Sequence, residues 1–177
     1  MDDVRYPIGK FEYKGVASAG ERNMWIGDIA DAPRDLRKAV EGLTAEQLDT
    51  PYRDGGWTVR QVVHHLPDSH LNAYVRLRLA LTEDDPTIKP YEESRWAELQ
   101  DARTAPAEVS LQLLDALHQR MVALMRSLDD AAWQRTFRHP EYGPFTLEKL
   151  LAMYAWHGRH HVAQIAGLRK RKGWNGS

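Results

Sequence analysis

The sequence contains no cysteine. This absence excludes disulfide bonds, thiolate zinc sites and cysteine nucleophiles, and it fits an intracellular compartment. Any metal site in the chain must therefore be built from histidine and carboxylate side chains.

The sequence also lacks an excess of charge of either sign. Twenty-four Lys and Arg residues face 25 Asp and Glu residues, which leaves a formal net charge of -1 at pH 7. Without a basic field to attract polyanions, we expect no nucleic-acid partner and no binding to an anionic membrane. The basic run at residues 169–172 is better explained as a complement to the dipole at a helix C-terminus.

Long hydrophobic runs are missing as well. The longest apolar run, residues 150–156, is far too short to span a bilayer. The first residues have neither the basic leader nor the apolar core of a signal peptide. We therefore expect a cytoplasmic protein.

The remaining composition is that of an ordinary folded protein, with 42% hydrophobic and 28% charged residues. A length of 177 residues suits one domain, which we expect to cover residues 1–177. No stretch of alternating β-branched residues calls for a sheet, so the predicted fold class is all-α.

Apolar residues recur at helical spacing in four long segments, at residues 20–41, 58–81, 107–128 and 146–172. Four long amphipathic helices predict a four-helix bundle, with residues 6–20 as an extended arm lying on it. We expect Pro33 to kink or break the first helix and Thr104 to cap the third. Shorter elements complete the prediction, namely helical turns within residues 44–47, 92–99 and 129–135 and a loop at residues 139–144.

Histidines are concentrated in two of these helices. His157 and His161 fall on the apolar stripe of the last helix, so both side chains are predicted to point into the bundle. Residues four apart lie one turn apart on the same face, and two such imidazoles can bind one ion at roughly 2.0–2.1 Å per Zn–N bond. The alternative is a pair of core histidines, each hydrogen-bonded to a neighbour.

The second helix offers His64, His65 and His70 as a third ligand, and helical periodicity alone does not choose among them. It favours His65 over His64 only slightly. His70 is central on the apolar stripe, which suits either a core imidazole or an outer partner of a ligand. In the last helix, His160 is predicted to lie at the flank of the apolar stripe and Arg159 to lie in solvent.

The last helix lacks the His-Glu-x-x-His pattern of zinc proteases. Gly158 stands where that pattern needs a glutamate as the general base. Metalloprotease chemistry of that type is therefore excluded, and no catalytic residue can be assigned. Asp68, His70 and His118 are candidates for a base or an outer partner, but surface charge and core packing explain them better.

Two sequence motifs resemble the DinB/YfiT superfamily, and in particular its YfiT group. The first is Gly-Gly-Trp-Thr-Val-Arg-Gln-Val-Val-His-His-Leu at residues 55–66, followed by Asp-Ser-His at 68–70. The second is Trp-His-Gly-Arg-His-His at residues 156–161, followed by Gln164. The likeness also includes residues 6–9, 48–56, 88–91 and 173–174, so it covers nearly the whole chain.

This resemblance implies a four-helix bundle of unusual topology, a homodimer and a metal-dependent hydrolase. It also implies one zinc ion per chain, with nickel as a second possibility, held by three histidines. The family's first ligand is eight residues after the tryptophan of its Trp-Thr-Val-Arg motif, which corresponds to His65, and the other two correspond to His157 and His161. Pro67 departs from the family pattern, which more often has alanine there.

Three functions follow from such a centre. Three neutral imidazoles leave an open position on the metal, where a bound water can become a nucleophile for hydrolysis of a small-molecule substrate. The first alternative is a metal-dependent thiol S-transferase that uses a low-molecular-weight thiol such as bacillithiol. The second is a non-catalytic bundle that the metal only stabilises.

Overall fold

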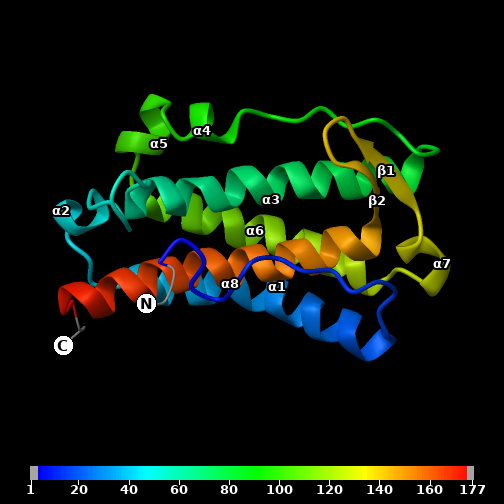
Figure 1. Ribbon diagram of the computed structural model, residues 1–177, viewed down its shortest axis with the longest axis horizontal. Helices are drawn as coiled ribbons and strands as arrows, with labels where there is room; N and C mark the ends of the chain where they lie inside the picture. Colours follow the sequence, from blue (N-terminus) through cyan, green and yellow to red (C-terminus); the bar gives the residue numbers. More distant parts are fainter. Residues whose placement is uncertain (1–3, 175–177) are drawn as a thin grey trace.

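The structure is a computed structural model that describes residues 4–174, and its four long helices form the predicted bundle (Figure 1). These helices are α1 (Ala19–Val40), α3 (Val59–Thr82), α6 (Ala107–Arg126) and α8 (Leu147–Lys172). The short elements are α2 (Ala45–Leu48), α4 (Glu93–Trp96), α5 (Gln100–Thr104), α7 (Asp130–Trp133), β1 (Thr136–His139) and β2 (Gly143–Thr146).

The order of the helices around the bundle differs from their order in the chain. Helix α1 packs mainly on α8 and α6, and α3 packs mainly on α6 and α8. The cyclic order is therefore α1, α6, α3, α8. In Figure 1 the connection between α3 and α6 runs back along the length of the bundle, so these neighbours are parallel, whereas α3 and α8 are antiparallel. The two histidine-bearing helices, α3 and α8, thus lie side by side.

Side-chain caps and glycines define the helix ends. Ser18 and Glu21 form a capping box at the start of α1, and Thr58 and Gln61 form one at the start of α3. Gly173 ends α8 in the left-handed region, with φ of 67°, which an L side chain rarely adopts.

Helix α1 continues through Pro33 without a break, as α3 continues through Pro67. One expectation about the helix ends is wrong. Thr104 does not cap the third long helix, because it is the last residue of α5, and Pro106 stands at the N-cap of α6 without a side-chain hydrogen bond.

The expected loop at residues 139–144 is instead part of a β-hairpin. Strands β1 and β2 pair antiparallel, with Phe137 opposite Phe145 and the two rings stacked 5.5 Å apart. Both rings are buried against the end of the bundle. Strands of four residues are too short to show a reliable alternation of apolar and polar residues, and tertiary packing of two phenylalanines stabilises this pair.

The apolar core is divided into two clusters along the bundle axis. One cluster contains residues 73–80 of α3 and 147–155 of α8, and the other contains residues 59–66 of α3 together with Ile165 and Leu168 of α8. Between these clusters α3, α6 and α8 contribute buried polar side chains, which are His70, His118, His161 and Gln164. The bundle thus contains a histidine-rich layer between two apolar blocks.

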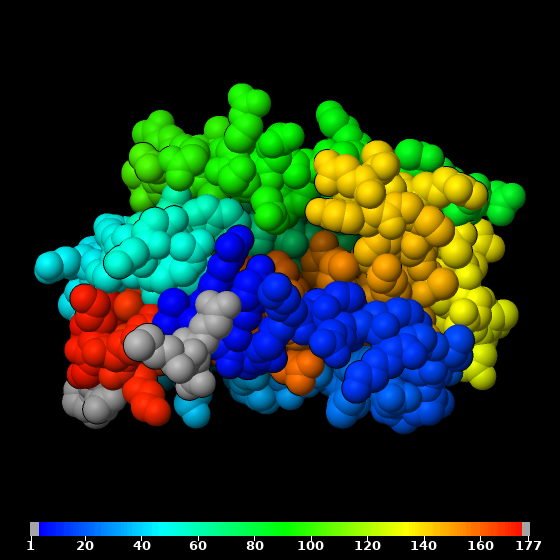
Figure 2. All heavy atoms as spheres, viewed as in Figure 1, coloured from blue at the N-terminus to red at the C-terminus, as the bar shows by residue number. Residues whose placement is uncertain are grey.

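The segment before α1 lies along α8 (Figure 2). Its main anchor is Glu148, which is fully buried and accepts hydrogen bonds from Tyr13 Oη at 2.6 Å and the Ala17 backbone N–H at 2.8 Å. Arg22 adds an ion pair to the same carboxylate at 2.9 Å. Burial and the neighbouring carboxylate raise the pKa of Tyr13 to about 12. Among the described residues, no helix is long and apolar enough to cross a membrane.

Candidate metal centre

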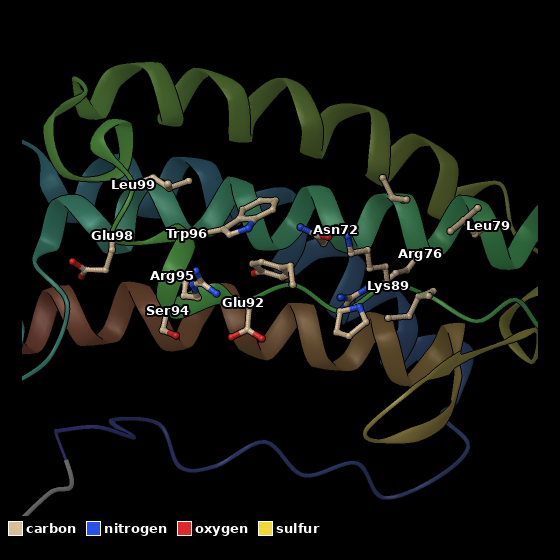
Figure 3. Close-up of a pocket in the computed structure, with 14 residues that line it drawn as sticks. Asn72, Arg76, Leu79, Lys89, Glu92, Ser94, Arg95, Trp96, Glu98 and Leu99 are labelled. Carbon is tan, nitrogen blue, oxygen red and sulfur yellow. The ribbon is translucent and has the colours of Figure 1, made fainter.

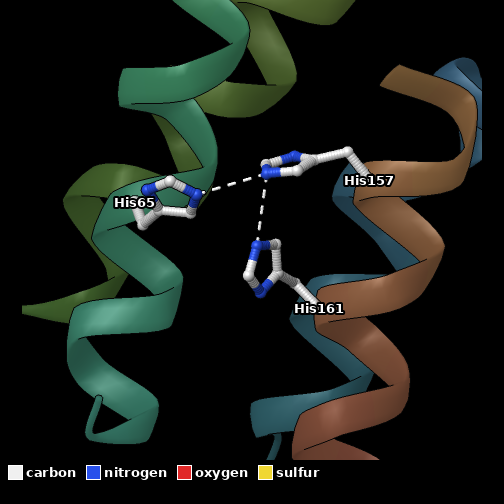
Figure 4. Close-up of side chains that lie close together, drawn as sticks. All are labelled: His65, His157 and His161. Atoms are coloured by element: carbon white, nitrogen blue, oxygen red, sulfur yellow. Dashed lines mark hydrogen bonds between the residues drawn. The ribbon is translucent and has the colours of Figure 1, made fainter. Parts of the chain in front are cut away.

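Three histidine side chains from α3 and α8 converge on one point (Figure 4). The Nε2 atom of His157 lies 3.2 Å from the Nε2 of His65 and 3.2 Å from the Nε2 of His161. All three candidate ligand atoms lie within 4.8 Å of one another. Two nitrogens bound tetrahedrally to one zinc ion at roughly 2.0–2.1 Å are about 3.3–3.4 Å apart, so this spacing fits a shared ion.

Burial keeps these three imidazoles neutral. Burial lowers the pKa of His65 from 6.5 to about 4. Burial first, and then the neighbouring histidines, hold the pKa of His157 and His161 well below 6.5. A neutral imidazole has one unprotonated nitrogen, which is the form that binds a metal.

Gln164 fixes which nitrogen of His161 carries the proton. The Gln164 amide nitrogen donates to the backbone carbonyl of Arg5 at 3.0 Å, so its oxygen is the atom 2.8 Å from His161 Nδ1. That oxygen can only accept, so Nδ1 carries the proton and Nε2 has a free lone pair. The lone pair faces His157, and a cation between the rings would satisfy it.

A line of buried rings continues behind His157. Its Nδ1 lies 3.1 Å from Nε2 of His70, and the other nitrogen of His70 lies 2.8 Å from Nε2 of His118. His118 Nδ1 in turn donates to the backbone carbonyl of Ile29 at 2.6 Å. His70 and His118 are therefore hydrogen-bonded core imidazoles, with His70 in direct contact with a member of the cluster.

His64 lies outside the cluster. Its Nδ1 is 2.7 Å from the Ser110 hydroxyl and its Nε2 is 3.1 Å from the Ala105 carbonyl, so it joins α3 to α6 and the end of α5. Adjacent residues on a helix point about 100° apart. The side chain of His65 is thus the member of the adjacent pair that faces α8.

His160, which the sequence places at the flank of the apolar stripe, is buried in the structure. His160 is only 6% exposed, its ring stacks on Trp156 with centroids 4.4 Å apart, and its Nε2 accepts from Gln164 at 2.9 Å. The N-terminal segment covers this flank, with Tyr6 5.9 Å from the His160 ring. Arg159 is exposed, as predicted. Helical periodicity reports the faces that other helices cover, and it misses a face covered by an irregular segment.

A cleft of about 320 Å³ opens onto the cluster. Its walls include Trp57 and Trp156, and Trp57 packs against His65 with ring centroids 4.7 Å apart. Arg5 and Arg53 add two guanidinium groups to the lining. A larger groove of about 1060 Å³ lies between α3 and residues 88–99, and none of the three clustered histidines lines it (Figure 3).

Glu93 is the functional candidate that the sequence did not reveal. It is the one carboxylate among the described residues that line the cleft, and burial raises its pKa. It is the first residue of the short helix α4, in the connection between α3 and α6, where no sequence motif marks it. Asp68, the carboxylate that the sequence did mark, has its pKa raised to about 6 by burial, then by Asp101, but it does not line this cleft.

Comparisons with known proteins agree with this geometry. Residues 28–165 match the sequence model of the DinB superfamily. A Bacillus cereus (strain B4264) protein named "Putative metal-dependent hydrolase" is 55% identical over 174 residues, which is 98% of this chain and 100% of that protein. A Bacillus mycoides (strain KBAB4) protein of the same description is 53% identical over the same shares.

Among solved structures, YfiT from Bacillus subtilis matches with a TM-score of 0.95 and 49% sequence identity, over 97% of this chain and 99% of that one. YfiT is described as a probable metal-dependent hydrolase with an unusual four-helix bundle topology.

Proposed function

The chain belongs to the DinB superfamily, and from that premise we propose that it is a metal-dependent hydrolase in which His65, His157 and His161 hold one zinc or nickel ion per chain. The observation that carries the proposal is the convergence of three neutral imidazoles at the end of a cleft large enough for a small molecule. The names of the relatives support the same class of reaction.

A zinc ion held there would polarise a substrate carbonyl and lower the pKa of water to about 7. Neutral ligands suit this role, because they leave the full charge of the ion available. Trp57 and Trp156 line the cleft beside the histidines and give it apolar walls. Glu93 is the one carboxylate among the described residues of the cleft wall, and desolvation raises its pKa, which makes it the candidate for a proton acceptor or donor at the site.

Elemental analysis of the untagged protein tests the metal site. We expect about one zinc or nickel ion per chain in the wild type and background content in His65→Ala. The matched control is His139→Ala, because His139 lies on β1 and outside the cluster. Retention of metal in His65→Ala would contradict the ligand assignment, and absence of metal from the wild type after zinc addition would contradict the proposal as a whole.

The reaction class is tested on the metal-loaded protein with a panel of small esters, lactones and amides. Hydrolysis that disappears in His65→Ala and persists in His139→Ala supports the proposal. Turnover of an electrophile only in the presence of an added low-molecular-weight thiol would replace hydrolysis by thiol S-transfer and would leave the metal site in place.

A further inference from the structure

An unbroken line of hydrogen-bonded groups joins the backbone of α1 to the cluster. It runs from the Ile29 carbonyl through His118 and His70 to His157, with contacts of 2.6, 2.8 and 3.1 Å. His118 is 2% exposed and His70 is fully buried. All four ring nitrogens of His70 and His118 therefore have a hydrogen-bond partner within the protein.

The Ile29 carbonyl determines which nitrogen donates and which accepts in each hydrogen bond of this line. A carbonyl oxygen only accepts, so His118 Nδ1 must donate to it. His118 and His70 are buried, and the hydrogen-bond partners along the line are a carbonyl oxygen and other imidazoles rather than carboxylates, so each ring is neutral and has a single N–H. His118 Nε2 must then accept from His70 Nδ1, and His70 Nε2 must accept from His157 Nδ1. This leaves His157 Nε2 without a proton.

We propose that His70 and His118 are positioning residues, which hold His157 in the tautomer that presents an unprotonated Nε2 toward His65 and His161. The inference rests on the metal site proposed above. Gln164 does the same for His161 through one hydrogen bond, whereas His157 is held through two rings and a backbone carbonyl. Two of the three candidate ligands thus have their proton fixed on the nitrogen that faces away from the other two.

Packing keeps the line in place. The His70 ring stacks on His118 with centroids 4.7 Å apart, and the Tyr154 ring meets it edge-on at 4.9 Å. Gly158 allows α1 to approach α8 closely, because a Cβ at position 158 would lie 3.1 Å from the Cβ of Ala32 and 4.0 Å from Cε1 of His70. Ala32 is three residues beyond Ile29 on α1. The small residue therefore lies beside the turn of α1 that supplies the carbonyl.

Loss of the hydrogen-bond acceptor at position 118 should weaken metal binding at the cluster. In His118→Leu the Nδ1–H of His70 has no partner in a buried site, which favours the tautomer with the proton on Nε2. That proton would then point at His157 Nδ1 and favour the form of His157 protonated on Nε2, which cannot bind a metal. Removing such outer partners typically weakens metal binding by about 10–100-fold.

The first test reads the tautomers directly, by nitrogen-15 NMR of histidine rings in the metal-free wild type at pH 7.5. We expect His70, His118 and His157 each to carry the proton on Nδ1. A proton on Nε2 of His70 or His118 would overturn the inference. Because this test uses no metal, it stands even if the wild type binds none, a result that would instead contradict the proposed function.

The second test measures zinc affinity by competition with a chelator. We expect the dissociation constant to rise by about 10–100-fold in His118→Leu. It should stay within about threefold of the wild type in His118→Gln, whose amide can still donate to Ile29 and accept from His70. Leu114→Ala is the control for loss of stability, because Leu114 is fully buried on α6, outside the line of rings. Equal affinities for His118→Leu and Leu114→Ala would overturn the inference. Where His118→Leu fails to fold, the NMR result decides.

Discussion

Gly158 of α8 lies so close to Ala32 of α1 that a methyl group at position 158 would stand 3.1 Å from the Ala32 Cβ. This contact explains why the last helix has no glutamate between its two clustered histidines. A side chain at position 158 would meet α1 rather than the cleft. The zinc-protease pattern is thus excluded by the packing of α1 on α8 as well as by sequence.

Alanine at this glycine should cost stability that alanine at a neighbouring helical glycine does not. Gly27 of α1 has open space around the position of a Cβ, so Gly27→Ala should raise the free energy of unfolding by about 0.5–1 kcal/mol. Gly158→Ala should be less stable than Gly27→Ala by about 1–3 kcal/mol, because the Ala32 Cβ is fixed to the backbone and cannot rotate away. Urea denaturation measures the free energy of unfolding of both variants. Equal stabilisation by the two substitutions would contradict the prediction, because it would mean that α1 shifts without cost to make room for a methyl group at position 158.

The buried carboxylate of Glu148 should be a major anchor of the N-terminal segment. Glu148→Gln removes the buried charge that pairs with Arg22, and because Arg22 keeps Asp130 as a second partner, the loss should be about 1.5–3 kcal/mol. Glu108→Gln breaks the exposed pair with Arg37 and should cost less than about 1 kcal/mol. Denaturation curves of the two variants test this contrast. Similar small losses would mean that Glu148 contributes no more than a surface charge.

Acid should destabilise the metal-free protein through its neutral buried histidines. Burial lowers the pKa of His118 from 6.5 to about 4, so below pH 6.5 the unfolded chain binds a proton that the folded chain does not. The free energy of unfolding should fall between pH 6.5 and 4, by up to roughly 1.4 kcal/mol per pH unit for each such histidine.

Urea denaturation at several pH values, in the presence of a chelator, measures this slope. His118→Gln should have a shallower dependence on pH than the wild type, because one of the contributing groups is gone. An identical slope in both proteins would contradict the assignment of a depressed pKa to His118.

Gln164 should tune metal affinity without being a ligand. In Gln164→Leu the acceptor for His161 Nδ1 is lost, and the dissociation constant for zinc should rise by about 10–100-fold. Gln61→Leu is a suitable control, since Gln61 is a buried glutamine of α3 that bonds residues 97 and 98 rather than a clustered histidine. Equal zinc affinity in both variants would contradict a role of Gln164 in metal binding.

Much of the fold could be predicted from the sequence, because four long helices carry strong apolar periodicity and clear caps. The hairpin could not, since its strands have four residues each and depend on Phe137 packing against Phe145. The inward direction of His161 followed from periodicity, whereas the burial of His160 depends on an irregular segment that periodicity does not describe.

The choice of His65 over His64 depends on which helix lies beside α3, and this neighbour is set by the order of helices around the bundle. Periodicity within α3 favours His65 only slightly, so the family resemblance made the choice. Glu93 was missed because its place beside the cleft comes from the course of the long connection between α3 and α6, which helical periodicity does not predict. The homodimer and the extent of the domain over residues 1–177 stay predictions, and light scattering in solution tests the first.

X-ray absorption spectroscopy at the metal edge tests the central claim most directly, on zinc-loaded wild type of known stoichiometry. We predict three imidazole nitrogens at roughly 2.0–2.1 Å from one ion per chain in the wild type, and no such imidazole-bound ion in His65→Ala, His157→Ala or His161→Ala. A spectrum without imidazole scattering, or one that is unchanged in all three variants, would contradict the assignment of this cluster as the metal centre.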